Sequence, residues 1–266
     1  MARTVLGTGE TRGLGTLRVR CPPDTFALTP ASRITVAAVG ASRHRLQGAG
    51  IDWGSGVGCV AIAAARVPAV RRVIGLEIRP ENVRAARDNA AANGVADRVR
   101  FFQADSYAPA EPEGRRALAE LEDRAGFVVA NPPASTGDDG FGWRREVARG
   151  AIAYLRDGGA LLVQVSSQYG MGRVRGLEDE APGLRHDGVA ASTGWVPFDM
   201  RRPHLLRNLE TFAAAEAAGQ PPYAFRWPGG PAAAISAREA LGRHRETGRS
   251  PLSRWQVQRF VYRPSQ

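Results

Sequence analysis

The chain has 266 residues, 43% of them apolar, which is enough for one well-cored domain with an appended segment or for two small domains. Its formal net charge is +10, no lysine occurs, and the only cysteines, Cys21 and Cys59, lie far apart without metal-ligand spacing. The cysteine count excludes a fold held together by several disulfide bonds. Because no apolar run reaches membrane-spanning length and no apolar leader stands at the start, the sequence predicts a reduced cytoplasmic protein.

Residues 1–45 are predicted to form a cap or lid ahead of the core. Residues 17–20 alternate apolar and charged side chains, as in a short strand, and the apolar run in 33–39 predicts a helix. The sequence between them, Cys-Pro-Pro-Asp-Thr-Phe-Ala-Leu-Thr-Pro, contains too much proline for a regular helix. We therefore expect an irregular segment that leads into the core.

Strand-like and helix-like segments alternate over residues 46–198, the predicted catalytic core. This rhythm predicts a parallel sheet wrapped by helices through right-handed crossovers. The strands are expected near residues 50–52, 73–77, 99–103, 126–130, 160–165 and 189–191. The helices are expected over residues 57–67, 80–93 and 143–155, with a polar, partly helical connection over 170–184.

Residues 199–253 separate the last two predicted strands and are too many for a plain loop. Pro203 begins an amphipathic helix, and a weaker helix is predicted over 232–243. The apolar face of the first helix holds Leu205, Leu206, Leu209 and Phe212. Residues 254–266 contain the final core strand, 255–262, and a tail. We interpret the insertion as a segment that covers or shapes an active site.

The turn after the first core strand carries the sequence Asp-Trp-Gly-Ser-Gly-Val-Gly. Gly54 and Gly56, on either side of Ser55, allow a sharp turn and a close approach of the backbone to a ligand. The dinucleotide motif requires glycine where Cys59 stands, and the phosphate-binding loop requires a lysine. Asp52 would repel a pyrophosphate, but it suits the ammonium and sulfonium groups of a methionine moiety.

Two further groups stand at the ends of the next strands. Glu77 ends the second strand, where its carboxylate can accept hydrogen bonds from ribose hydroxyls, and Ile78 can pack on the face of an adenine. Asp105, after the third strand, is placed to accept from the adenine amino group, with the backbone of Ser106 nearby. Together with the glycine turn, these residues predict a site for S-adenosylmethionine (SAM).

The sequence Asn131-Pro132-Pro133 follows the apolar run 127–130 of the fourth strand. The Asn131 amide oxygen and a backbone carbonyl fixed by Pro132 can both accept from the amino group of a substrate. They would direct its lone pair toward a methyl carbon, so that catalysis would consist mainly of positioning. The alternative interpretation is a rigid turn after a strand, because Asn-Pro-Pro favours turns.

Taken together, these residues resemble the class I SAM-dependent methyltransferases over about residues 15–170 and in the terminal strand. The Asn-Pro-Pro sequence is similar to the (Asp/Asn)-Pro-Pro-(Tyr/Phe) motif of the subgroup that methylates planar nitrogens in adenine, in guanine of ribosomal RNA and in protein glutamines. Residues 25–30 are similar to the segment before the core of that subgroup. The resemblance implies a doubly wound, Rossmann-like α/β fold whose seven-stranded sheet has the order 3-2-1-4-5-7-6, with the last strand antiparallel.

One position departs from that motif, because Ala134 stands where the subgroup has an aromatic ring that stacks on the acceptor. Tyr169, at the ligand end of the fifth strand, can offer an aromatic face to a sulfonium in a cation–π contact of about 1–2 kcal/mol. The alternative is a surface tyrosine in a loop. The other aromatic candidates are Tyr107, Phe141, Trp143, Trp195 and Phe198.

The first hypothesis for the reaction is methyl transfer to a nitrogen that Asn131 orients. The acceptor would be a small molecule, a protein side chain or a nucleic acid. The net charge favours a polyanion, although the arginines are spread along the chain. The four dispersed histidines indicate no metal site.

The second hypothesis is a SAM-consuming cyclase, which needs no partner beyond SAM. The amino group of SAM would attack its own γ-carbon, giving azetidine-2-carboxylate and methylthioadenosine. Asn131 would hold the amine, Tyr169 the sulfonium, and Ser192 or Ser167 would handle the proton. A third hypothesis is a non-catalytic module that binds SAM or RNA.

Overall fold

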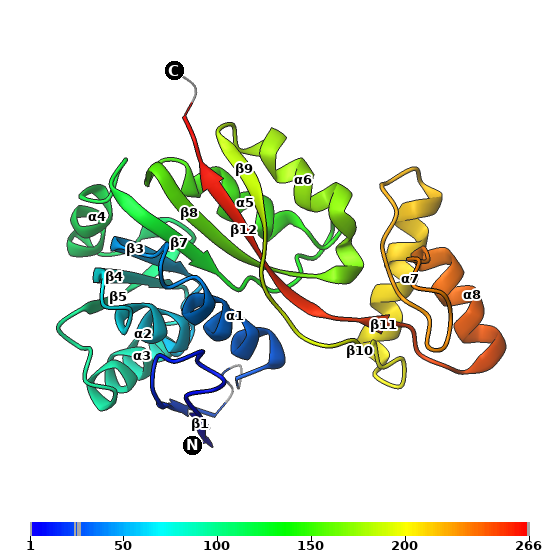
Figure 1. Ribbon diagram of the computed structural model, residues 1–266, viewed down its shortest axis with the longest axis horizontal. Helices are drawn as coiled ribbons and strands as arrows, with labels where there is room; N and C mark the ends of the chain where they lie inside the picture. Colours follow the sequence, from blue (N-terminus) through cyan, green and yellow to red (C-terminus); the bar gives the residue numbers. More distant parts are fainter. Residues whose placement is uncertain (1, 24, 26–27, 265–266) are drawn as a thin grey trace.

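The computed structural model describes residues 2–23, 25 and 28–264, and this part of the chain forms one central eight-stranded sheet (Figure 1). In spatial order its strands are β6 (Ala108–Pro109), β5 (Val99–Asp105), β4 (Val70–Glu77), β3 (Gly48–Trp53), β7 (Ala125–Ala130), β8 (Leu155–Ser166), β12 (Trp255–Tyr262) and β9 (Leu184–Ser192). Strand β12 is antiparallel to both neighbours. Apart from the two-residue edge strand β6, the order in chain numbering is 3-2-1-4-5-7-6, which confirms the predicted sheet.

Strand β7 illustrates why the middle of this sheet consists of unbroken apolar runs. All six of its residues are buried. Phe127 and Val129 belong to the hydrophobic cluster on one face, whereas Val128 and Ala130 belong to the cluster on the other. Successive side chains of a strand point to opposite faces, so a strand covered by helices on both sides needs apolar residues at every position.

Helices cover both faces of the sheet (Figure 1). The helices that contribute to the first cluster are α1 (Pro30–Ala41), α2 (Cys59–Ala65) and α3 (Pro80–Ala92). Those of the core that contribute to the second cluster are α4 (Pro112–Ala119), α5 (Gly142–Ala151) and α6 (Gly170–Glu180), and the two helices between β9 and β12 extend that cluster. Each crossover therefore places its helix against one of the two faces, as a doubly wound sheet requires.

The N-terminal segment contains an antiparallel hairpin of β1 (Ala2–Leu6) and β2 (Leu17–Cys21). Strand β2 confirms the strand predicted from the alternation in 17–20, whereas β1 was not predicted. The side chains of Asn89 and Asn93 in α3 accept hydrogen bonds from the backbone N–H groups of Arg20 (2.9 Å) and Arg18 (3.0 Å). The hairpin is thereby held against the core helix α3.

The segment between β9 and β12 carries α7 (Pro203–Ala217) and α8 (Ala237–Thr247), which pack on each other and extend beyond the sheet (Figure 1). The short antiparallel pair β10 (Val196–Pro197) and β11 (Leu252–Ser253) connects this pair of helices to the core. The Tyr223 hydroxyl also donates to the Asp139 carbonyl oxygen at 2.8 Å, which ties the insertion to the loop after β7.

Besides β1, other details of the secondary structure differ from the prediction. The helix expected over 143–155 ends at Ala151, because β8 begins at Leu155. The second helix of the insertion begins at Ala237 rather than near 232, because Ser236 caps it by accepting from the N–H of Glu239 at 3.1 Å. Helix α4 was not predicted, since its eight residues give too short a pattern for a periodicity argument. Within the residues that the structure describes, no helix combines the length and apolarity required to cross a membrane.

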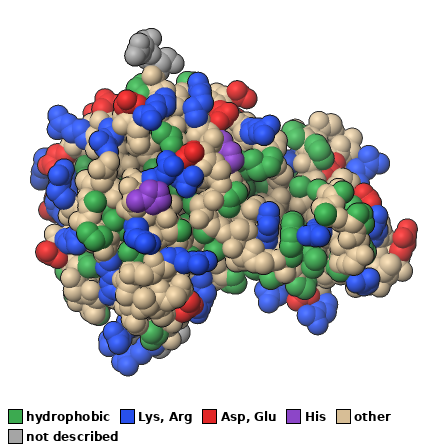
Figure 2. All heavy atoms as spheres, in the orientation of Figure 1, with side chains coloured by type: hydrophobic (Ala, Val, Ile, Leu, Met, Phe, Trp, Pro, Cys, Tyr) green, Lys and Arg blue, Asp and Glu red, His purple; other side chains and the backbone are tan. Residues whose placement is uncertain are grey.

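Arginine side chains are spread over the visible face of the main body and over the α7–α8 lobe, interrupted by acidic side chains (Figure 2). Many arginines of the described chain form ion pairs with exposed carboxylates, as Arg72 does with Glu120 and Arg263 with Asp157. The positive charge of this face is thus distributed rather than gathered in one stripe.

Candidate active site

A cavity of about 870 Å³ opens at the carboxyl ends of β3, β4, β5, β7 and β8. This is the edge at which parallel α/β sheets bind their ligands, and the volume suits a nucleoside together with a second small molecule. Residues from the start of α1 line one wall, and residues 196–212 of the insertion line another. The cavity therefore lies between the sheet and segments far away in the sequence.

The glycine turn after β3 forms one side of this cavity. Gly54 and Gly56 have φ values of +66° and +54°, and a Cβ added to either would meet no described heavy atom within 4 Å. Gly58 has φ +85°, and its Cβ would come within 2.8 Å of Phe101 Cζ and 3.1 Å of Ala86 Cβ. The first two glycines thus keep space open on the cavity side, whereas Gly58 allows α2 to pack against α3 and β5.

Alanine substitutions should separate these two roles. We expect Gly58→Ala to lower the free energy of unfolding by about 2 kcal/mol, through overpacking and left-handed strain. Gly54→Ala should lower it by only about 1 kcal/mol, through strain alone, but should weaken the binding of S-adenosylhomocysteine. Urea denaturation and calorimetry of both variants measure this. Equal destabilisation by the two substitutions would contradict the assignment.

Asp52 lies at the end of β3, buried in the wall of the cavity. Its Oδ2 accepts a hydrogen bond from the backbone N–H of Ala61 in α2 at 2.8 Å. Burial raises the pKa of this carboxyl to about 8, the Ala61 N–H opposes the shift, and the neighbouring Glu77 adds to it. A cationic group in the cavity would favour the ionised form and bring the pKa back down.

This shift predicts how stability depends on pH. The Asp52 carboxyl ionises near pH 3.8 in the unfolded chain and near pH 8 in the folded one. Between these values the folded state keeps a proton that the unfolded state has lost, so the contribution of Asp52 to stability falls as pH rises. Asp52→Asn should therefore gain stability relative to the parent between pH 5 and pH 8, as measured by urea denaturation. A difference that does not change with pH would contradict this.

Glu77 ends β4 and is almost fully buried, with both carboxylate oxygens engaged. Oε2 accepts from the N–H of Gly56 at 2.8 Å, and Oε1 accepts from Asn82 Nδ2 at 3.1 Å and from the N–H of Arg79 at 3.0 Å. Two buried polar atoms on the cavity wall, Ser55 Oγ and Asn82 Oδ1, have no hydrogen-bond partner within the described chain. A polar ligand with several donors, such as a nucleoside, fits this arrangement because it would satisfy these atoms.

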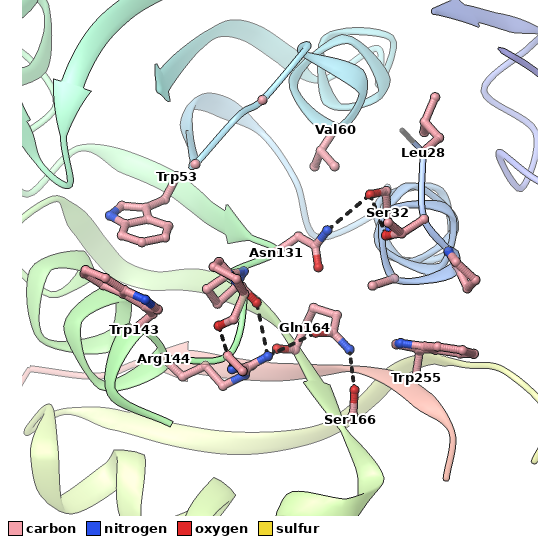
Figure 3. A pocket seen from close by; sticks show the side chains of 18 of the residues that line it. Leu28, Ser32, Trp53, Val60, Asn131, Trp143, Arg144, Gln164, Ser166 and Trp255 are labelled. Atoms are coloured by element: carbon pink, nitrogen blue, oxygen red, sulfur yellow. Dashed lines mark hydrogen bonds between the residues drawn. The ribbon is translucent and has the colours of Figure 1, made fainter. Parts of the chain in front are cut away.

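The remaining predicted nucleoside contacts lie in the same part of the cavity. Ile78 is exposed there, next to Asp105 and Ser106. The Ser106 hydroxyl accepts from Trp53 Nε1 at 3.0 Å. The Trp53 ring lies 6.3 Å from that of Trp143, and the two indoles stand on the same side of the cavity (Figure 3). The sequence analysis assigned no role to Trp53, although it stands inside the glycine motif.

Asn131 stands at the centre of the cavity, immediately after β7 (Figure 3). Its Nδ2 donates to the hydroxyl of Ser32 in α1 at 3.3 Å. The amide is thereby oriented with its nitrogen toward α1 and its oxygen away from it, as Figure 3 shows. The oxygen is left for a donor inside the cavity.

Arg144 of α5 holds the Asn-Pro-Pro turn in place. Its guanidinium is buried and donates to the carbonyl oxygens of Pro132 (3.1 Å) and Pro133 (3.1 Å). It also donates to Gly140 O (3.3 Å), to Gln164 O (2.9 Å) and to Gln164 Oε1 (3.2 Å). The Pro132 carbonyl keeps a second lone pair for another donor. No sequence pattern marked Arg144, because all but one of the oxygens to which it donates belong to the backbone.

Two residues assigned at the sequence level lie differently from what was expected. Tyr169 lines the cavity but is buried among other aromatic rings, and the Arg144 guanidinium lies 4.9 Å from its ring centroid. Its face therefore already holds a cation. Ser192 is exposed at the end of the edge strand β9, donates to the Thr193 carbonyl and is not among the residues that line the cavity. The structure does not bring it to the site.

Comparison with known proteins agrees with this geometry. The family model of the methyltransferase small domain matches residues 27–181, more than half of the chain. The chain belongs to this family. It is therefore a class I SAM-dependent methyltransferase by fold and family, and the predicted family is confirmed. Family membership implies SAM as the methyl donor, and the open glycine turn and the unpaired polar atoms fit that ligand.

The curated relatives include release factor glutamine methyltransferases and, over shorter stretches, ribosomal protein L11 methyltransferases such as that of Haemophilus ducreyi, which is 48% identical over 54 residues, 20% of this chain and 18% of the relative. The glutamine methyltransferase of Cereibacter sphaeroides is 32% identical over 161 residues, 52% of this chain and 53% of the relative. That of Vibrio cholerae is 26% identical over 188 residues, 71% of this chain and 57% of the relative. The chain thus spans little more than half the length of these glutamine methyltransferases.

Among solved structures, the YcgJ protein of Bacillus subtilis aligns with a TM-score of 0.52 at 14% identity. The alignment covers 86% of this chain and 99% of YcgJ. At this identity the likeness concerns the fold alone.

The residues matched by the methyltransferase small domain, 27–181, include the glycine turn, Glu77, Asp105 and the Asn-Pro-Pro turn, whereas α7 and α8 lie outside them.

Proposed function

We propose that this methyltransferase transfers a methyl group from SAM to a nitrogen that Asn131 orients. The observation that carries the proposal is the fixed amide of Asn131, whose Nδ2 donates to Ser32 at 3.3 Å while its oxygen faces the cavity. An oxygen in that position accepts from an N–H group of the acceptor. The names of the glutamine methyltransferase relatives support a nitrogen acceptor.

The donor supplies an electrophilic methyl group on a sulfonium. We assign its binding to the predicted residues at the ends of β3, β4 and β5. Asp52 would face its positively charged methionine end. Glu77 would accept from a ribose hydroxyl with the lone pair of Oε2 that its three present hydrogen bonds leave. Ile78 would pack on the adenine, and Asp105 would accept from the adenine amino group, with Ser106 beside it.

The acceptor would lie between the Asn-Pro-Pro turn and the indoles. Asn131 Oδ1 and the Pro132 carbonyl would both accept from its N–H groups, which turns the nitrogen lone pair toward the methyl group. Ala134 stands where the related motif has an aromatic residue that stacks on the acceptor. Trp143 would supply this ring instead, because it projects from the start of α5 beside the Asn-Pro-Pro turn (Figure 3). We propose that residues 1–45 and 199–253 act as the segments that shape this end of the cavity.

Methyl transfer is favoured over intramolecular cyclisation by the positions of these side chains. Cyclisation would use the face of Tyr169 for the sulfonium and Ser192 or Ser167 for the proton. Arg144 covers the ring of Tyr169, and neither serine lines the cavity. The whole cavity, at about 870 Å³, is also large enough for SAM together with a second small molecule.

The test is to incubate the protein with SAM, alone and with pools of peptides, nucleic acid or small amines, and to identify the nucleoside product by mass spectrometry. S-adenosylhomocysteine that forms only with an acceptor supports methyl transfer. Methylthioadenosine without any acceptor would instead identify a cyclase, and SAM binding without either product would identify a non-catalytic module. Glu77→Ala serves as the control and should abolish SAM binding.

A further inference from the structure

Four arginines line the cavity in the described chain, and three of them have polar partners in the protein. Arg144 is surrounded by carbonyl oxygens. Arg202 lies 3.6 Å from an Asp199 carboxylate oxygen, and Arg79 lies 2.5 Å from one of Glu81. The fourth is Arg254, immediately before β12.

The guanidinium of Arg254 has no carboxylate within ion-pair distance among the described residues. It lies 4.7 Å from the ring centroid of Trp195, and its Nε is buried without a hydrogen-bond partner. An aromatic face attracts a cation but accepts no N–H hydrogen bond of ordinary strength. The terminal nitrogens of this guanidinium donate no hydrogen bond within the described chain and, unlike the buried Nε, are open to a ligand.

The backbone of Arg254 is fixed relative to the sheet. Its N–H donates to Ser167 Oγ at 3.1 Å, and its carbonyl accepts from the Ser167 N–H at 2.9 Å. The indole of Trp195 holds the side chain from one side. The contacts of its backbone and side chain thus hold the guanidinium of Arg254 in place.

The charge lies on the acceptor side of the cavity. Going across the sheet, Asn131 follows β7, Ser166 ends β8, and Trp255 pairs with Ser166 at the start of β12. Two strand spacings, about 10 Å, separate the Asn131 and Trp255 strands. Ser166, Ser253 and Trp255 line the cavity together with Arg254. The acidic residues assigned to SAM lie on the other side of β7.

We propose that the acceptor carries a carboxylate or a phosphate group, which Arg254 binds while the acceptor nitrogen lies at Asn131. This inference rests on the proposed methyl transfer, because that reaction defines the acceptor side. A guanidinium presents a planar set of donors that matches either anion with two hydrogen bonds. The substrate class is thus a nitrogen compound that also carries an anionic group, which would lie on the β12 side of Asn131.

The test compares three small probes that share a phenyl ring: the anions benzoate and phenyl phosphate, and neutral benzamide. Calorimetry would measure their binding to the protein alone and to its complex with S-adenosylhomocysteine, in the parent, R254M, R254K and R226M. Arg226 lies 5.4 Å from the same Trp195 ring but does not line the cavity, so R226M is the matched control. R254K preserves the charge should R254M disturb the fold.

We expect the parent and R226M to bind at least one of the anions about tenfold more tightly than benzamide. R254M should lose this preference, and R254K should keep part of it. The tighter of the two anions then distinguishes a carboxylate from a phosphate.

Three results would overturn the proposal. The first is that the parent binds the anions no more tightly than benzamide, and the second is that R254M keeps the same preference for anions as the parent. The third is a tenfold loss of S-adenosylhomocysteine affinity in R254M while its binding of the probes is unchanged. The last would assign Arg254 to the carboxylate of the donor. If S-adenosylhomocysteine binds to no variant while the anion preference persists on the protein alone, the methyl-transfer proposal fails and the anion site stands.

Discussion

Asn131→Ala is expected to lower kcat about 100-fold, because the substitution removes the oxygen that orients the acceptor nitrogen. The affinity for S-adenosylhomocysteine should change by less than about threefold, since the loss concerns the transition state rather than the donor. Initial rates of S-adenosylhomocysteine release, with whichever acceptor pool supports turnover in the parent, measure the first quantity. Calorimetry measures the second.

Ser32→Ala is the graded control for this prediction. It removes the partner of Asn131 Nδ2 but leaves Oδ1 in place. The amide then loses its fixed orientation, so kcat should fall less than in Asn131→Ala. If Asn131→Ala turns over as fast as the parent, the assigned role of this residue is wrong.

Arg144→Met is expected to lower the free energy of unfolding by about 4 kcal/mol. The substitution leaves buried acceptors without a donor, including the Pro132 and Pro133 carbonyls and both oxygens of Gln164. Burial lowers the pKa of the guanidinium, so some stability returns when the charge is removed. The unpaired carbonyls outweigh that gain. Urea denaturation followed by circular dichroism measures the difference.

Arg149→Met on the same helix provides the matched control. Arg149 is exposed and pairs with Glu180, whose carboxylate accepts from its Nε at 3.0 Å. An exposed ion pair contributes about 0–1 kcal/mol, so this substitution should change stability very little. Similar losses in the two variants would show that the buried contacts of Arg144 are not the cause.

Much of the donor half of the site could be predicted because its residues occupy strand ends. Asp52, Glu77 and Asp105 each stand at the carboxyl end of a core strand, and parallel strands bring these ends to one edge of the sheet. The glycines of the turn are recognisable for a related reason, since their conformational requirement is local. The strand order itself came from the resemblance to a family and not from the pattern alone.

The acceptor half of the site was harder to predict from the sequence, because its contacts join residues far apart in the chain. Ser192 looked suitable at the end of a strand, but that strand is the outermost one, beyond β12, so its end lies outside the cavity. Tyr169 does follow β8, yet packing places the Arg144 guanidinium on its ring. Neither outcome depends on residues near these positions in the sequence.

By itself, the sequence determined the parallel core, the glycine turn and the position of Asn131 after the fourth core strand, because these depend on periodicity and on neighbouring residues. Only the tertiary structure decided which side chains surround Asn131. Ser32 orients its amide, Arg144 secures the turn after it, and Arg254 adds a charge from the end of the chain. Such contacts depend on how the sheet, α1 and the last strand meet in space, and hydrogen bonds to backbone oxygens leave no pattern in the sequence.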